Sequence, residues 1–188
     1  MLYLPRPDYR LLRKLHGLRL RHLLYPHPGL PAGQGKKHCH QPLEFHFCGR
    51  GHNDNAEKLM AQWAAGRERC FYYWKPLEMM PEIYRQADIV LIPSRSTEGT
   101  SLAALEAMAC GKPVIAGLAG GLSDIIIHGY NGYLIKPTVE NLVAAIEDLA
   151  LNKDKRKLMG RRAREVAVTF DRKIWAERWA RVLGEVFR

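Results

Sequence analysis

Residues 89–111 read IVLIPSRSTEGTSLAALEAMACG, which combines three kinds of local pattern. The apolar run at 89–92 predicts a short buried strand. The alanine- and leucine-rich run at 101–110 predicts a helix that ends at Gly111. The polar residues between these two runs predict a tight turn. A strand that passes through a turn into a helix is the repeating unit of α/β proteins.

Two glutamates occupy contrasting places in this unit. Glu98 lies in the turn, beside the unpaired amides of the helix start, which attract anions. Glu106 follows Leu102 by one helical turn and shares a predicted inward face with Leu105 and Ala109, where a carboxylate is costly unless something bonds to it. Together they indicate a site for a polyol phosphate. In the simpler interpretation, Glu98 only stabilises the helix dipole and Glu106 is solvated at the edge of its stripe.

From residue 43 onward, predicted strands and helices alternate. This order favours an α/β fold with a doubly wound parallel sheet of the Rossmann-like type. The other predicted strands cover 43–48, 69–74, 113–116 and 133–135, and the other predicted helices cover 56–65, 81–86, 122–127, 139–150, 153–168 and 171–186. We expect an irregular basic segment at 1–42, a nucleotide-sugar-binding domain at 43–170 and a C-terminal helix at 171–188, which Asp171 caps.

Three glycine-rich turns follow predicted strands, at 49–51, 98–101 and 117–121. The carboxyl ends of parallel strands meet at one edge of a sheet, where α/β proteins bind ligands. Each turn alone has a structural explanation, because tight turns need glycine. Their convergence on one edge favours a binding site.

The composition fits one domain with an ordinary core. The chain has 188 residues, a hydrophobic fraction of 47% and a formal charge of +10. Neither a membrane-spanning run nor a signal-peptide pattern is found, so we expect a cytoplasmic protein. The positive charge favours anionic partners, but no nucleic-acid-binding motif appears. The basic cluster at 153–164 has helical spacing; it fits the solvated face of a surface helix or, alternatively, a peripheral membrane contact.

The cysteines give little support for a metal site. The four cysteines form no Cys-x-x-Cys pair, and reduced thiols fit a cytoplasmic protein. His38-Cys39-His40 could bind a metal, but no second ligand pair stands near it in the sequence. We therefore predict no metal.

Several motifs resemble the C-terminal half of retaining glycosyltransferases of the GT-B fold, in the family-four group (glycosyl transferases group 1). They are ADIVLIPS at 87–94, EG at 98–99, EAMA at 106–109, GKPVIA at 111–116, GG at 120–121 and NG at 131–132. The resemblance runs from about residue 43 to the C-terminus. It implies a UDP-, GDP- or ADP-sugar as donor substrate, retention of anomeric configuration, and no metal or other cofactor.

The resemblance also implies a role for particular residues. Glu98 would be catalytic, contacting the donor sugar near its reacting carbon, and Glu106 would bind the ribose hydroxyls. The amides of Thr100, Ser101 and Leu102 would cradle the diphosphate, and Gly99 beside them would also belong to the donor-binding set. Gly49 and Gly51 would let the backbone approach the phosphates. The nucleobase would lie against the loop that contains Trp74, Lys75 and Pro76.

The sequence departs from the family in three ways. The N-terminal half, which carries the acceptor site, has no counterpart here, so we expect it from a longer chain or a partner chain. The basic residues near the start, Arg10, Arg13 and Lys14, match the family's phosphate-clamping arginine and lysine only in type, and Tyr73 stands where the family often has glycine. A stand-alone domain that binds a nucleotide sugar without turnover is the alternative. The apolar stripe predicted on the helix at 171–186 fits core packing or, without the second half, an exposed surface for association.

Overall fold

The structure is a computed structural model that describes residues 43–48, 58, 61–62, 64–66, 69–95 and 98–187. The strands are β1 (Phe45–Cys48), β2 (Cys70–Tyr73), β3 (Val90–Ile92), β4 (Val114–Gly117) and β5 (Gly132–Ile135). The α-helices are α3 (Met80–Gln86), α4 (Leu102–Ala109), α5 (Val139–Leu151), α6 (Lys153–Val168) and α7 (Arg172–Val186), and the 3-10 helices are η2 (Leu77–Met79) and η3 (Gly120–Asp124). Residues 58, 61–62 and 64–65 are helical, within the predicted helix at 56–65.

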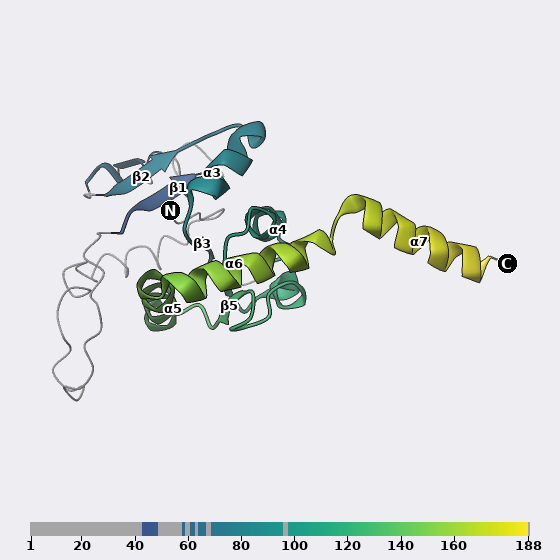
Figure 1. The fold of residues 1–188 in the computed structure, drawn as a ribbon. Coiled ribbons are helices and arrows are strands. Elements are labelled where there is room, and N and C mark those ends of the chain that lie inside the picture. Colours follow the sequence, from purple (N-terminus) through teal and green to yellow (C-terminus); the bar gives the residue numbers. More distant parts are fainter. Residues whose placement is uncertain are drawn as a thin grey trace, which may run out of the picture.

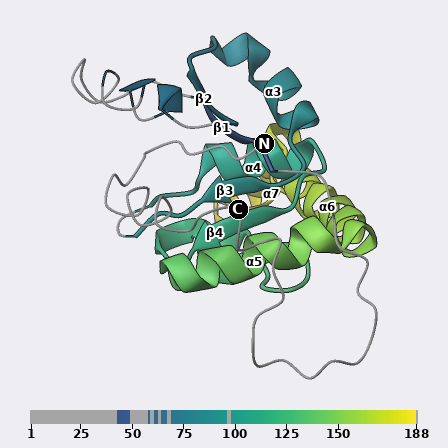
Figure 2. The ribbon, with the colours of Figure 1, turned by 90° about the vertical axis from the view of Figure 1, so that its left-hand side faces the viewer.

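All of these strand pairs are parallel, as predicted. β1 pairs with β2, and β3, β4 and β5 form a second sheet in that order. Successive residues of β3 face opposite apolar layers: Val90 and Ile92 pack with α3, α4 and α6, whereas Leu91 packs with α5. Helices thus cover both faces of the central sheet, and Figure 2 shows α5 lying along β4. This two-layer burial explains why the strands are apolar without alternation.

The free edge of the second sheet, at β5, is closed by local hydrogen bonds. The main-chain amide of Gly129 donates to the carbonyl of Gly132 at 2.8 Å. Nδ1 of His128 donates to the carbonyl of Leu134, also at 2.8 Å. Exposed strand edges are sites for unwanted strand pairing, so this local capping protects the edge.

The region before β5 corrects one prediction. In place of the helix predicted at 122–127, the chain forms the 3-10 helix η3, which ends at Asp124. The side chain of Asn131, fully buried, accepts a hydrogen bond from the amide of Ile127 and donates one to the carbonyl of Ile125. Because these backbone groups bond to a side chain, they do not extend the helix.

The basic cluster at 153–164 lies on α6, whose buried face consists of small and apolar residues. Met159, Gly160 and Ala163 are buried, while most of the lysines and arginines are exposed. The prediction of a solvated basic face is confirmed; the membrane contact stays a prediction. Within the part of the chain that the structure describes, no helix is long and apolar enough to cross a membrane.

Helix α7 corrects the prediction of core packing. Asp171 caps it as expected, because Oδ1 accepts from the amide of Lys173 at 2.8 Å. The helix extends away from the body, however, and none of its residues is buried (Figure 1). Its exposed large apolar side chains are Trp175, Trp179, Val182, Leu183 and Val186. The stripe exists, but nothing in the described part of the chain covers it.

Two helical glycines give a matched test of the packing. A β-carbon at Gly160 would lie 2.2 Å from the carbonyl oxygen of Gly111, whereas one at Gly184 would have no atom within 4 Å. We predict that Gly160→Ala destabilises the domain by about 1–3 kcal/mol through overpacking. In contrast, Gly184→Ala should stabilise α7 by up to about 1 kcal/mol. Urea unfolding of both variants measures the difference, and equal effects would contradict the close contact between α6 and the turn after α4.

Candidate functional site

The turn between β3 and α4 holds Glu98 in a defined position. Pro93 after β3 is buried, and the Ser94 amide donates to the carbonyl of Ile92 at 2.9 Å. The Ser94 hydroxyl then donates to Oε2 of Glu98 at 2.7 Å. A hydrogen bond to an ionised acceptor is stronger than a neutral one, so Ser94 orients this carboxylate. Nothing in the sequence pattern pointed to Ser94 as its partner.

A second glycine-rich turn, 117–121, packs directly against this one. A β-carbon at Gly117 would lie 2.0 Å from the Ser94 carbonyl oxygen, and one at Gly120 would lie 1.8 Å from that of Glu98. Gly120 also has a φ of +49°, and the amide of Gly121 donates to the Glu98 carbonyl at 3.1 Å. Only glycine allows such an approach. The predicted convergence of these two turns is therefore confirmed, while Gly49 and Gly51 lie outside the described residues.

The start of α4 lies directly after Glu98. The helix begins at Leu102, one residue later than predicted, and Ser101 is its N-cap. The Ser101 side chain makes no capping hydrogen bond, although the residue is only 4% exposed. The first amides of a helix have no intrahelical acceptor. Thr100 and Leu102 are exposed, which brings this amide cluster to the surface beside Glu98.

Glu106 lies on a different side of α4 from the one predicted. The buried face consists of Ala104, Ala107 and Met108, while Leu102, one turn before Glu106, is 70% exposed. Glu106 is half-buried rather than inward-facing. Helix α4 is apolar almost all round, so its sequence could not indicate which side faces the core.

The carboxylate of Glu106 is bonded by a residue that the sequence did not single out. The hydroxyl of Tyr84, on α3, donates to Oε2 of Glu106 at 3.1 Å. The two residues are 22 positions apart, so helical or strand spacing could not have paired them. The need for a partner was predicted from the cost of burying a carboxylate, and the structure supplies one.

The segment predicted to receive a nucleobase follows β2. Trp74 and Lys75 are exposed, and Pro76 precedes η2. Before them, burial and the negative charge of a Cys48 thiolate raise the pKa of Tyr73 to about 12, so its phenol is neutral at physiological pH. The Tyr73 hydroxyl lies 3.3 Å from Nδ1 of His46 on β1. This segment leads through η2 into α3, and α3 carries Tyr84 to Glu106.

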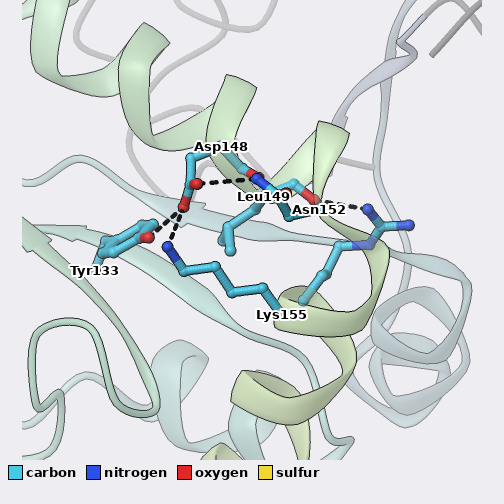
Figure 3. Close-up of polar contacts among 6 residues, drawn as sticks. Tyr133, Asp148, Leu149, Asn152 and Lys155 are labelled. Carbon is cyan, nitrogen blue, oxygen red and sulfur yellow. Dashed lines mark hydrogen bonds and ion pairs between the residues drawn. The ribbon is translucent and has the colours of Figure 1, made fainter. Parts of the chain in front are cut away.

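A second gathering of polar side chains lies on the far side of the sheet, between β5 and α5 (Figure 3). Lys155 and the Tyr133 hydroxyl both donate to Oδ2 of Asp148, with the Lys155 Nζ at 2.7 Å. These residues border a cavity of 470 Å³. Their charges are paired with one another, so we regard this cluster as structural. It joins α5, β5 and α6.

Among the described residues, no group of three or more histidine, cysteine, aspartate or glutamate side chains could hold a metal ion. His38-Cys39-His40 lies outside these residues. The described part of the candidate site consists of two carboxylates, helix-start amides and glycine backbone.

Comparison with known sequences identifies the family of this chain. A profile described as "Glycosyl transferases group 1" matches residues 33–166. The chain belongs to this family. It is 39% identical over 97 residues to an uncharacterized glycosyltransferase of Methanocaldococcus jannaschii, a match that covers 51% of this chain and 27% of that protein. It is 32% identical to the D-inositol 3-phosphate glycosyltransferase of Nocardia farcinica, over 92% of this chain and 34% of that protein.

The solved structures support the GT-B fold for this glycosyltransferase domain. Anabaena Alr3699/HepE in complex with UDP superposes with a TM-score of 0.74 at 20% identity, over 98% of this chain and 48% of that one. The C-terminal domain of a group 1 glycosyl transferase from Francisella tularensis, LpcC, has a TM-score of 0.66 at 20% identity, over 89% of this chain and 84% of that domain. The chain thus spans about a third of the length of these curated relatives and about half of the HepE chain.

The cluster at Asp148 gives a test of pH dependence. Partial burial acts to raise the pKa of Asp148, but hydrogen bonds from Lys155 and Tyr133 outweigh it and hold the pKa below its ordinary value. A lowered pKa in the folded state gives stability that is present above the unfolded pKa and lost as pH falls through the folded one. We predict that Asp148→Asn lowers the free energy of unfolding by about 1 kcal/mol at pH 7. The difference should shrink below about pH 4.

Urea unfolding at a series of pH values measures this difference. Glu82→Gln is the control. Like Asp148, Glu82 pairs with a basic side chain, here Arg85, but it is exposed on the surface of α3. A loss at Asp148 that is independent of pH would contradict a role for its charge.

Proposed function

We propose that this chain is the donor half of a glycosyltransferase and binds a nucleoside-diphosphate sugar at the β3–α4 turn. One observation carries the proposal: Glu98, before the start of α4, and Glu106, within α4, each accept a hydrogen bond from a hydroxyl. The turn that holds Glu98 also packs against a second glycine turn. The names of the relatives support it, since they include D-inositol 3-phosphate glycosyltransferases. HepE structures are in complex with UDP and with UDP-glucose.

The proposed donor lies across the turn from base to sugar. The amides of Thr100, Ser101 and Leu102 bind the diphosphate, because a helix start presents unpaired donors and a positive dipole end to anions. Glu106 accepts hydrogen bonds from the ribose hydroxyls, and Glu98 contacts the sugar.

The nucleobase lies near Trp74, Lys75 and Pro76. Gly99 belongs to the proposed donor-binding turn, and Gly49 and Gly51, which lie outside the described residues, are proposed to let the backbone approach the phosphates.

The proposed chemistry is stabilisation of a leaving group. Negative charge builds on the nucleoside diphosphate as its bond to the sugar breaks, and fixed amide dipoles lower the energy of that charge without reorganising. Glu98 orients the sugar near the reacting carbon, and transfer retains the anomeric configuration. A domain that binds the donor without turnover is the alternative.

Transfer also needs an acceptor site, which we propose is supplied by a second half, either in a longer chain or in a partner chain. The match covers 34% of the N. farcinica relative and 48% of HepE, so those proteins contain much that has no counterpart here. The apolar stripe of α7 is the proposed contact for that half, because an exposed patch of this kind marks an interaction surface.

A thermal-shift screen of UDP-, GDP- and ADP-sugars tests donor binding. A ligand that binds only the native state at 100 times its Kd should raise the melting temperature by roughly 5–10 °C. We predict that Glu106→Ala removes most of this shift. Glu165→Ala, a matched change at an exposed helical glutamate of α6, should keep it. No shift with any sugar nucleotide, or equal shifts in both variants, would count against the site.

An assay with the same sugar nucleotide distinguishes transfer of the sugar from binding alone. Glu98→Gln should keep most of the thermal shift while abolishing release of sugar from a labelled donor, because its amide still hydrogen-bonds but carries no charge. Binding without release in the unmutated chain would support the domain that binds without turnover.

The stripe on α7 has its own test. Without its proposed partner, the exposed apolar side chains should make the chain self-associate as its concentration rises toward about 100 μM. We predict that Trp175→Glu with Trp179→Glu abolishes this association. Charge reversal at Lys173 and Arg181 on the polar face should not. Analytical ultracentrifugation measures the association, and a monomer at all concentrations would contradict an adhesive surface.

A further inference from the structure

The ring of Tyr84 is fixed in the protein core. Tyr84 is only 1% exposed, and it packs in the same apolar layer as Met80 and Ile83 of α3 and Met108 of α4. Interiors of this kind are close-packed, so a buried ring has little freedom to move. The position of its hydroxyl is therefore set by the packing of α3 against α4.

This hydroxyl is the partner of a flexible acid. Glu106 has three side-chain torsions and is half-buried, so it would otherwise exchange among rotamers. The Tyr84 hydroxyl donates to its Oε2 at 3.1 Å. Fixing a glutamate side chain costs rotamer entropy, and here much of that cost is met before any ligand arrives.

The bond leaves part of the carboxylate available. An ionised carboxylate accepts about four hydrogen bonds over its two oxygens. Within the described residues, Oε1 of Glu106 has no hydrogen-bond donor. Tyr84 thus binds Oε2 of Glu106 and, by fixing the carboxylate, sets the direction in which Oε1 can accept a hydrogen bond.

We propose that Tyr84 is a positioning residue for donor binding, which fixes the Glu106 carboxylate in the orientation that accepts the ribose hydroxyls. The inference rests on the proposed function. In this role Tyr84 acts through Glu106, whose carboxylate accepts the hydrogen bond from its phenol. Ser94 makes the same kind of bond to Glu98, so each acid is oriented by a hydroxyl from an earlier part of the chain.

The test compares two variants that each remove one phenol hydroxyl. Tyr84→Phe keeps the buried ring and should raise the Kd for the nucleoside diphosphate selected by the screen (UDP, GDP or ADP) about tenfold, the scale of one hydrogen bond to a charged group. Tyr133→Phe also removes a hydroxyl–carboxylate bond, at Asp148, but lies outside the proposed site and should leave this Kd unchanged. Calorimetry at a temperature where urea curves show both variants folded measures the Kd.

Two further comparisons, one with a double variant and one with a nucleotide analogue, distinguish a positioning role from a general loss of structure. In the Glu106→Ala background, Tyr84→Phe should cause no further loss of affinity, since the residue through which it acts is gone. The 2′,3′-dideoxy form of the same nucleotide lacks the ribose hydroxyls, so it should bind the Tyr84→Phe variant and the unmutated chain equally. A merely structural role would weaken both nucleotides alike.

Each outcome bears on a separate claim. Unchanged nucleotide affinity in Tyr84→Phe, or a further loss in the Glu106→Ala background, would overturn the positioning role while the proposed function stands. Absence of nucleotide binding by the unmutated chain would overturn both. A selective, non-additive loss for the ribose-containing nucleotide supports the inference.

Discussion

The contact between the two glycine turns is the constraint on which the candidate site depends. The backbone at Gly120 approaches the carbonyl of Glu98 so closely that a single β-carbon would collide with it. The amide of Gly121 then bonds to the same carbonyl. Because both turns follow parallel strands, the sheet brings them to one edge, and their mutual packing fixes the backbone of Glu98 just before α4. The site thus derives its rigidity from main chain rather than from loop side chains.

The two acids illustrate how a rigid frame orients polar groups. Each carboxylate accepts a hydrogen bond from the hydroxyl of a residue that precedes it in the sequence: Ser94 for Glu98 and Tyr84 for Glu106. The two donors differ in their setting, since Ser94 is in the turn itself and Tyr84 extends from the core. The position of the Glu98 carboxylate therefore depends on the turn, whereas that of Glu106 depends on the packing of α3 against α4. This difference fits the roles proposed for the two acids, Glu98 at the sugar and Glu106 at the ribose.

Much of the fold was predictable because its strands and helices are strongly patterned. The helix 153–168 was predicted with its observed bounds, and the parallel strands were placed to within one or two residues. The predictions that were wrong depended on side-chain contacts and packing that the local sequence pattern does not specify. The hydrogen bonds from the Asn131 side chain to the backbone shortened the helix predicted at 122–127. The nearly uniform apolar character of α4 hid which side of this helix faces the core, and so the burial of Glu106. Tyr84 was beyond prediction, since its partner is brought near only by the packing of two helices.

The capped edge at β5 determines how another polypeptide can join this domain. With the carbonyls of Gly132 and Leu134 already bonded to Gly129 and His128, the sheet offers these groups to no additional strand. A polypeptide that approached this edge would meet side chains and not a continuous hydrogen-bond ladder. Side-chain interfaces can slide and re-form at little cost, whereas a shared sheet moves as one body. The edge capping therefore keeps the sheet of this domain from merging with that of a neighbour, so the two would remain separate bodies.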